Sequence, residues 1–382
     1  MSNTTRIKSL EVLRALAFIG VMLCNSGMFG MGPLGYWGVS IFLVLSGFVS
    51  VLNQYQKEAI KTSPEEVMKY AIGKIKKLYL LHVLTTLALA IFSFIGEKTE
   101  PIEKILTHLF TNLLLIQEWL PLENISINGP AWFLCPLFLS YFIFPFVINK
   151  MKKKYTKRKA LFSIIALYIT QVLISLISKN IPLNEYEENM FLVYNVSEWI
   201  IYYHPITRAM EIIIGYNLGY LYINRTKENI AKATLKEASV LILIFLSYFL
   251  AISTGIKTEY QQLIPTTNTN DWWRRTILYT PTTCLLIYLF AFEEGKISKI
   301  LTNKVTLYLA KISSYGFLIH NVVYRYLETI MYYLISEEFK YYYGPYVKAT
   351  IGILLTILCC EIWMLIDQRF IKKKNVMVTK SC

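Results

Sequence analysis

The chain has 382 residues, of which 55% are hydrophobic and 15% aromatic, and it carries a formal net charge of +14 at pH 7. This apolar content excludes an ordinary soluble globular protein and predicts an all-α, polytopic membrane protein. The positive charge lies in short clusters between apolar runs, as in multi-pass membrane proteins, and this placement argues against nucleic acid as a partner.

Ten stretches are long and apolar enough to predict transmembrane helices. They are 10–27, 36–54, 76–96, 131–149, 160–178, 200–222, 237–253, 274–292, 306–327 and 345–368. No linker or repeat divides them, so residues 1–382 are expected to form a single transmembrane domain in the cell membrane, surrounded by lipid.

An eleventh apolar stretch, 102–119, is ambiguous, and the distribution of charge decides how it is interpreted. With ten spans, the segments placed in the cytoplasm hold 27 Lys and Arg residues, whereas the outer loops hold five lysines. Counting 102–119 as a span would export the basic block 150–159 and reverse this asymmetry. We therefore predict that 102–119 is an interfacial or re-entrant helix and that both termini are cytoplasmic.

Arg14 and Asn25 stand out among the residues of the first apolar stretch. Eleven residues on a helix turn about 1100°, within about 20° of three full turns, so the two side chains share a face about 16 Å apart along the axis. A charge inside a membrane is costly and is usually retained for a task. The alternative is an arginine that snorkels to cytoplasmic headgroups and an asparagine that ends the helix.

The third and fourth spans add four further candidates. Lys74 and Lys77 share a face at the cytoplasmic end of the third span, and His82 follows slightly deeper. The lysines fit either topology determinants or ligands for the phosphate groups of a cytosolic donor. Trp132 follows an Asn-Gly-Pro turn and enters the membrane from outside, which also fits an interfacial anchor.

Ionisable residues also occur in the sixth and ninth spans. Arg208 and Glu211 are spaced i, i+3, so they can pair on one helix face, for a structural or a functional reason. His320 lies near the middle of its span, where a histidine suits a proton relay or a polar contact between helices.

Six segments in this order resemble the membrane-bound acyltransferase family 3 over nearly the whole chain. They are EVLRALAFIGVMLCN, GVSIFLVLSGF, KIKKLYLLH, NGPAWFL, HPITRAMEIIIG and ISSYGFLIH. The resemblance implies transfer of an acyl group, usually acetyl, from cytosolic acyl-CoA (acetyl-CoA) to a hydroxyl of an extracytoplasmic glycan. It also implies a stand-alone enzyme that needs no metal and acts on polysaccharide or lipid-linked sugar.

The resemblance assigns roles to the candidates already named. Arg14 would position the donor or stabilise charge, and Lys74 and Lys77, where the family usually has arginines, would face the phosphates of coenzyme A. The expected catalytic residues are Asn25, Arg14, Glu211 and His320, and the expected donor-binding residues are Lys74, Lys77, His82, Trp132 and Arg208.

Position 25 departs from the family pattern, which has a histidine there. An imidazole can remove a proton from a sugar hydroxyl near neutral pH, whereas the carboxamide of Asn25 cannot. The chain is therefore an impaired variant, natural or engineered, or it uses another base among His82, Glu211 and His320, or it has kept the fold for a different task. We favour the first explanation.

Two other functions compete with acyl transfer. A transporter or flippase for a polar lipid or sugar would also use intramembrane charges, and a non-catalytic partner in glycan assembly would explain Asn25. Six cysteines show no metal-ligand spacing. Assembly into a homo-oligomer is left open by the sequence.

Overall fold

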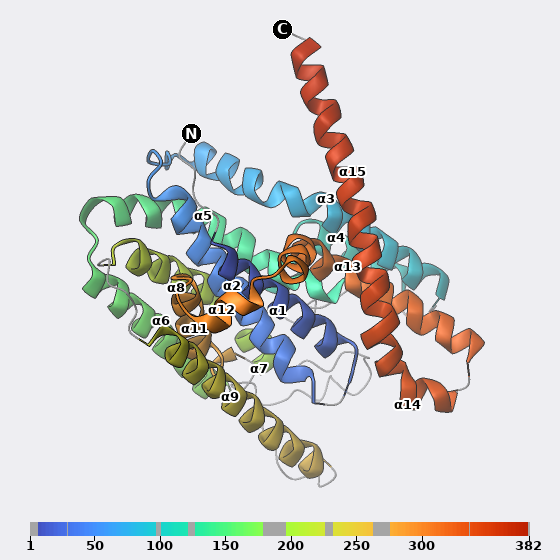
Figure 1. Cartoon of the computed structure of the whole chain (residues 1–382). Helices are drawn as coiled ribbons and strands as arrows, with labels where there is room; N and C mark the ends of the chain where they lie inside the picture. The colour runs from blue at the N-terminus through green and yellow to red at the C-terminus, as the bar shows by residue number, and fades with distance from the viewer. Residues whose placement is uncertain are drawn as a thin grey trace.

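The computed structural model describes residues 7–28, 30–96, 101–120, 127–178, 196–225, 232–262, 276–335 and 337–380. Within these ranges the chain is helical and contains no β-strand, which confirms the predicted all-α class. Figure 1 shows that the axes of most helices are broadly aligned, and that α15 extends past the other helices.

The first half of the chain forms α1 (Lys8–Asn25), α2 (Gly32–Gln54), α3 (Pro64–Gly96), α4 (Ile102–Leu113), η1 (Gln117–Trp119), η2 (Gly129–Phe133), α5 (Leu134–Lys154) and α6 (Lys157–Ser178). The second half forms α7 (Val196–Glu198), η4 (Trp199–Tyr203), α8 (Pro205–Ile223), α9 (Ala233–Gln262), α11 (Thr280–Phe290), α12 (Lys296–Leu301), α13 (Lys304–Leu334), α14 (Glu337–Val347), η5 (Lys348–Gly352) and α15 (Ile353–Lys380).

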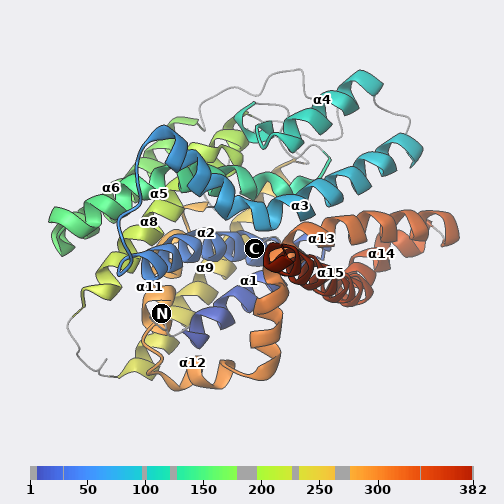
Figure 2. The same cartoon turned by 90° about the horizontal axis from the view of Figure 1, so that it is seen from above.

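Glycines allow α2 to approach its neighbours closely. A Cβ at Gly47 would overlap the Ile212 carbonyl of α8, and a Cβ at Gly215 would overlap the Val44 carbonyl of α2. Small residues at such crossings let helix backbones meet where lipid offers no hydrophobic driving force. Helices α2 and α8 therefore form the centre of the bundle, and Figure 2 shows them between α3 to α6 on one side and α1 with α12 on the other.

Contacts along the helices fix their relative directions. Tyr324 of α13 bonds to Met22 of α1 while Gly316 meets Phe18, so α1 and α13 run in parallel. Helix α2 runs back along α1, because Gly35 lies against Cys24. We refer to the end of the bundle where α1 ends and α2 begins as the outer end, and to the opposite end as the inner end.

Helix α4 covers only the first part of the ambiguous stretch 102–119. Its 12 residues cover about 18 Å, short of the roughly 30 Å hydrocarbon core. The helix begins just after α3 ends, yet Leu113 accepts a 2.7 Å hydrogen bond from Tyr79, well back along α3. It therefore doubles back along α3, as a re-entrant segment does.

The helices occur where the apolar runs predict them, but the number of spans is not confirmed. Six helical segments are long and apolar enough to cross a membrane, namely Gly32–Gln54, Pro64–Phe92, Gly129–Lys154, Lys157–Ser178, Ala233–Leu250 and Tyr342–Asp367. Among the described residues, α11 is an 11-residue helix, and part of the predicted span 274–292 lies outside them. The chain is thus a multi-pass membrane protein, and ten spans and cytoplasmic termini stay predictions.

Two predicted boundaries were wrong. Helix α3 begins at Pro64 rather than at residue 76, because Pro at the start and Glu65 and Glu66 in the first turn favour helix initiation. The predicted span 200–222 is interrupted at His204, since Pro205 starts a new helix and leaves η4 as a separate π-helical turn.

Candidate functional site

Asn25 lines a cavity of about 270 Å³ between the outer halves of the central helices. We refer to it as the Asn25 cavity. Its lining comes from α1, α2, η2, η4 and α13 and includes Asn25, Tyr36, Trp132, Tyr202, Tyr203 and Asn321. The cavity thus joins segments that are far apart in the sequence, and two of its residues, Asn25 and Trp132, were expected at the site.

The amide of Asn25 is held by its own helix. Nδ2 donates a 2.9 Å hydrogen bond to the carbonyl of Val21, one turn earlier, and the residue is exposed. Asn321 donates to Oδ1 of Asn128 at 3.3 Å, and Asn128 donates to Oγ1 of Thr85 at 3.0 Å. Asn25 and Asn321 therefore each use one of their two amide N–H groups on the protein, and their carbonyl oxygens accept no bond from a described residue.

Four aromatic residues form one wall of the cavity. Trp132 lies 5.2 Å from Tyr202 and 5.4 Å from Tyr203 between ring centroids, and Tyr36 lies 5.6 Å from Tyr202. Tyr202 and Tyr203 are the last two residues of the π-helical turn η4. A pocket of rings with a few polar groups is typical of sites that bind small organic ligands.

Arg208 and Glu211 lie behind this wall as a fully buried ion pair. Nη1 of Arg208 contacts Oε1 of Glu211 at 2.7 Å, which confirms that the two residues pair across one helical turn. The guanidinium carbon lies 5.0 Å from the centroid of Tyr202 and 5.5 Å from that of Trp132. Cation–π contacts of this kind hold the rings in place.

Arg14 lies nearer the inner end and pairs with Glu11 at 3.1 Å. Nζ of Lys74 lies 5.3 Å from the ring centroid of Tyr70. The lining of the Asn25 cavity does not include Arg14.

Lys77 is exposed like Lys74 and lies beside α13. Its Nζ is 5.4 Å from the ring centroid of Tyr315. The candidate site residues thus include an inner group, Arg14, Lys74 and Lys77, and an outer group around Asn25. Arg14 and Asn25 lie on one continuous helix, so about 16 Å of α1 separates the two groups along the axis.

Both candidate histidines are fully buried and neither lines the Asn25 cavity. Nε2 of His82 bonds to the carbonyl of Asn112 at 2.9 Å and so ties α3 to α4. Nδ1 of His320 bonds to the carbonyl of Gly316 at 3.0 Å, and its ring packs between Phe317 and Tyr324. In this arrangement neither imidazole reaches the space beside Asn25.

The sequence did not single out Tyr36, Tyr202, Tyr203 or Asn321 as site residues. A Tyr-Tyr pair directly before the His-Pro break was a visible signal, because a helix interruption inside an apolar run often lines a cavity. Asn321 had a weaker signal, as an amide next to His320 within a span.

Comparison with known proteins identifies the family of the chain. Residues 7–362 match the sequence profile of the acyltransferase 3 family, described as an acyltransferase domain. The chain belongs to this acyltransferase family. Among curated proteins, it is 29% identical over 167 residues to the acyltransferase MdmB of Streptomyces mycarofaciens. That match spans 40% of this chain and 41% of MdmB. No solved structure matches the chain. Membership of the family supports acyl transfer as the general activity.

Proposed function

We propose that the chain transfers an acyl group, with acetyl as the first candidate, from cytosolic acyl-CoA to a hydroxyl of an extracytoplasmic polysaccharide or lipid-linked glycan. The observation that carries this proposal is the family match over residues 7–362, combined with a cavity at position 25. In the reaction the hydroxyl oxygen bonds to the thioester carbonyl carbon, the carbon–sulfur bond breaks, and coenzyme A leaves as the thiol with the proton that the hydroxyl loses.

The inner group of residues suits the donor. Lys74 and Lys77 are exposed cations at the inner half of α3, where they would hold the phosphates of coenzyme A. Arg14, half-buried near the inner end of α1, would guide the acyl arm toward the cavity or stabilise charge at the thioester carbonyl.

The Asn25 cavity suits the acceptor. A sugar ring presents C–H faces to aromatic rings and hydroxyl edges to amides, and the cavity offers Trp132 and Tyr202 for the first and the carbonyl oxygens of Asn25 and Asn321 for the second. Arg208 and Glu211 would act behind the wall, by holding Trp132 and Tyr202 in position.

We further propose that transfer is slow in the chain as written. Asn25 stands in the cavity where the family has a base, and Glu211, His82 and His320 do not line that cavity. Because Asn25 also fits a non-catalytic partner in glycan assembly, that role is the second candidate. Transfer of labelled acetyl to membrane glycan, present with the chain and absent without it, distinguishes an enzyme from such a partner.

The donor is tested by saturable binding of labelled acetyl-CoA to the purified protein in detergent. The proposal expects binding that unlabelled coenzyme A displaces. A transporter for a polar lipid or sugar has no reason to bind coenzyme A, so an absence of saturable binding would favour transport.

A further inference from the structure

A polar stripe on α13 leads from the Asn25 cavity toward the outer end of the bundle. Asn321 lines the cavity, and Arg325 and Glu328 follow at four and seven residues. This spacing places all three on one face of the helix. The stripe therefore begins at the cavity and continues two turns further toward the outer end of the bundle.

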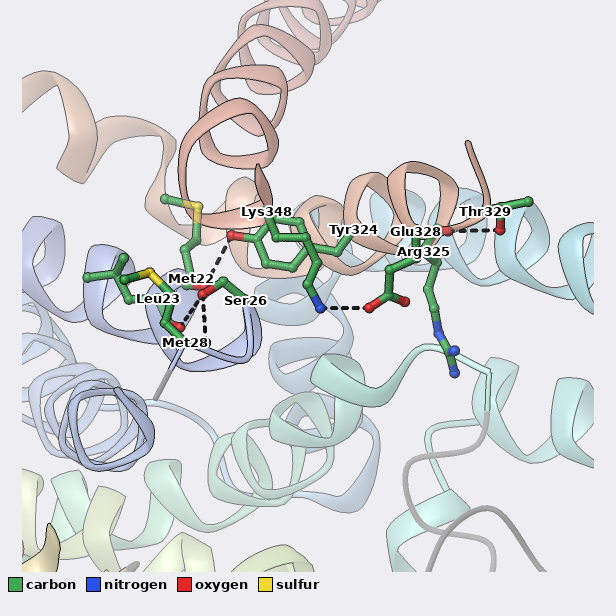
Figure 3. Close-up of polar contacts among 9 residues, drawn as sticks. All are labelled: Met22, Leu23, Ser26, Met28, Tyr324, Arg325, Glu328, Thr329 and Lys348. Carbon is green, nitrogen blue, oxygen red and sulfur yellow. Dashed lines mark hydrogen bonds and ion pairs between the residues drawn. The ribbon is translucent and has the colours of Figure 1, made fainter. Parts of the chain in front are cut away.

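Lys348, the first residue of the π-helix η5, pairs with this stripe. Its Nζ contacts Oε1 of Glu328 at 2.6 Å, and the lysine side chain is largely buried (Figure 3). The same nitrogen lies beside Gly27, two residues after Asn25, at 3.8 Å from the position of a Cβ there. The ion pair therefore lies next to the end of α1 that carries Asn25.

The Lys348–Glu328 pair leaves Arg325 available. Arg325 and Glu328 are three residues apart on one helix and would ordinarily pair with each other. Glu328 is instead bound by Lys348, and Figure 3 shows the Arg325 guanidinium extending past the carboxylate without contacting it. Arg325 is exposed, and its guanidinium has no hydrogen bond or ion pair with any residue in the described part of the chain.

Arg325, which pairs with no described residue, is a cation at the outer end of the bundle. Lys and Arg are disfavoured outside the membrane, where the charge distribution of the sequence places the outer end. A guanidinium presents a planar fork of donors that matches a carboxylate or a phosphate. We infer that Arg325 binds the anionic group, a carboxylate or a phosphate, of an acidic acceptor sugar held in the Asn25 cavity.

This inference rests on the proposed function and adds the charge of the acceptor to it. The same chemistry would also bind a phospholipid headgroup, so the test separates the two sources. Because Lys348 holds Glu328, we infer in addition that Lys348 is a positioning residue, which keeps Arg325 free for the ligand.

The test uses the full chain in nanodiscs of phosphatidylcholine and two probes, 4-nitrophenyl β-D-glucuronide and the uncharged 4-nitrophenyl β-D-glucoside. We expect the glucuronide to bind about tenfold more tightly, the lower range for a charge-assisted hydrogen bond at a solvent-accessible site. Arg325→Gln should abolish the preference. Lys311→Gln, at an exposed position near the inner end of the same helix, should leave it unchanged.

Two further variants test the role of Lys348. Lys348→Met frees Glu328 to pair with Arg325, so the preference for glucuronide should fall although Arg325 is present. Adding Glu328→Gln to Lys348→Met should restore it, because Arg325 is released again. A purely structural loss caused by Lys348→Met would not be restored by the second substitution.

Equal binding of the two glycosides by the unaltered protein, or a preference that survives Arg325→Gln, would overturn the inference. Replacing part of the phosphatidylcholine by phosphatidylglycerol tests whether Arg325 binds a phospholipid headgroup instead of a sugar. If Arg325→Gln reduces bound phosphatidylglycerol in native mass spectra and the glycosides bind equally, Arg325 serves a lipid headgroup and the inference is wrong. Binding of labelled acetyl-CoA by the same preparations shows independently whether the proposed function holds.

Discussion

Restoring a base at position 25 is the change whose effect the structure defines best. In Asn25→His, the imidazole can donate Nδ1–H to the carbonyl of Val21, because Asn25 already donates to that carbonyl at 2.9 Å. His320 makes the equivalent contact to Gly316, one turn earlier on its own helix, at 3.0 Å. This bond would fix the tautomer and direct the basic Nε2 into the Asn25 cavity.

The expected gain follows from what a positioned base contributes. General base catalysis is worth about 10²–10⁴-fold in rate, which corresponds to about 2.7–5.5 kcal/mol of transition-state stabilisation. We expect at least about tenfold for Asn25→His, because the neighbouring residues have not been adapted to the new side chain. An imidazole base must be unprotonated, so the rate should rise with pH through the ordinary histidine pKa of about 6.5.

The assay measures transfer of labelled acetyl from acetyl-CoA to endogenous glycan in membrane vesicles that contain equal amounts of each variant. Asn25→Gln is the matched control, since it keeps an amide and cannot take up a proton. Equal rates for the asparagine, glutamine and histidine forms would remove position 25 from the mechanism and refute this reasoning.

Two further predictions concern the donor site and the ion pair. The double substitution Lys74→Ala with Lys77→Ala should weaken acetyl-CoA binding about tenfold or more, because charge-assisted bonds to phosphate are lost. Lys76→Ala on the same helix is the control and should leave the affinity unchanged. Equal losses of affinity in the two variants would point to a general effect of positive charge. Arg208→Met should destabilise the protein by about 3–5 kcal/mol in thermal unfolding, because it leaves Glu211 buried without its partner, and adding Glu211→Leu should recover most of that loss. No recovery in the double variant would contradict the account of the pair as a buried ion pair.

The sequence was sufficient to locate most helices, because each is a long apolar run between basic clusters. It also predicted the Arg208–Glu211 contact, which depends only on helical spacing. The start of α3 was missed although its signals were visible, since Ser63, Pro64 and an acidic first turn precede the apolar run. Residue spacing within one helix is thus readable from sequence, whereas apolar content alone locates a helix end poorly.

The cavity could be predicted only in part. Asn25 was found because it departs from the apolar pattern around it, and Trp132 because it follows an Asn-Gly-Pro turn. Tyr202 and Asn321 were missed because their role depends on how η4 and α13 meet α1 in space. Arg325 appears ordinary in sequence, and it becomes notable only once Lys348, far along the chain, is seen to occupy the partner that Arg325 would otherwise have.

The central claim is that this chain moves an acyl group from a cytosolic thioester to a surface glycan. Mass spectrometry of the glycans tests it most directly, in cells in which the gene is deleted, restored as written, or restored as Asn25→His. We expect a mass increase of one acyl group per modified sugar, strongest with the histidine form and absent after deletion. Identical glycan masses in all three strains would contradict the claim.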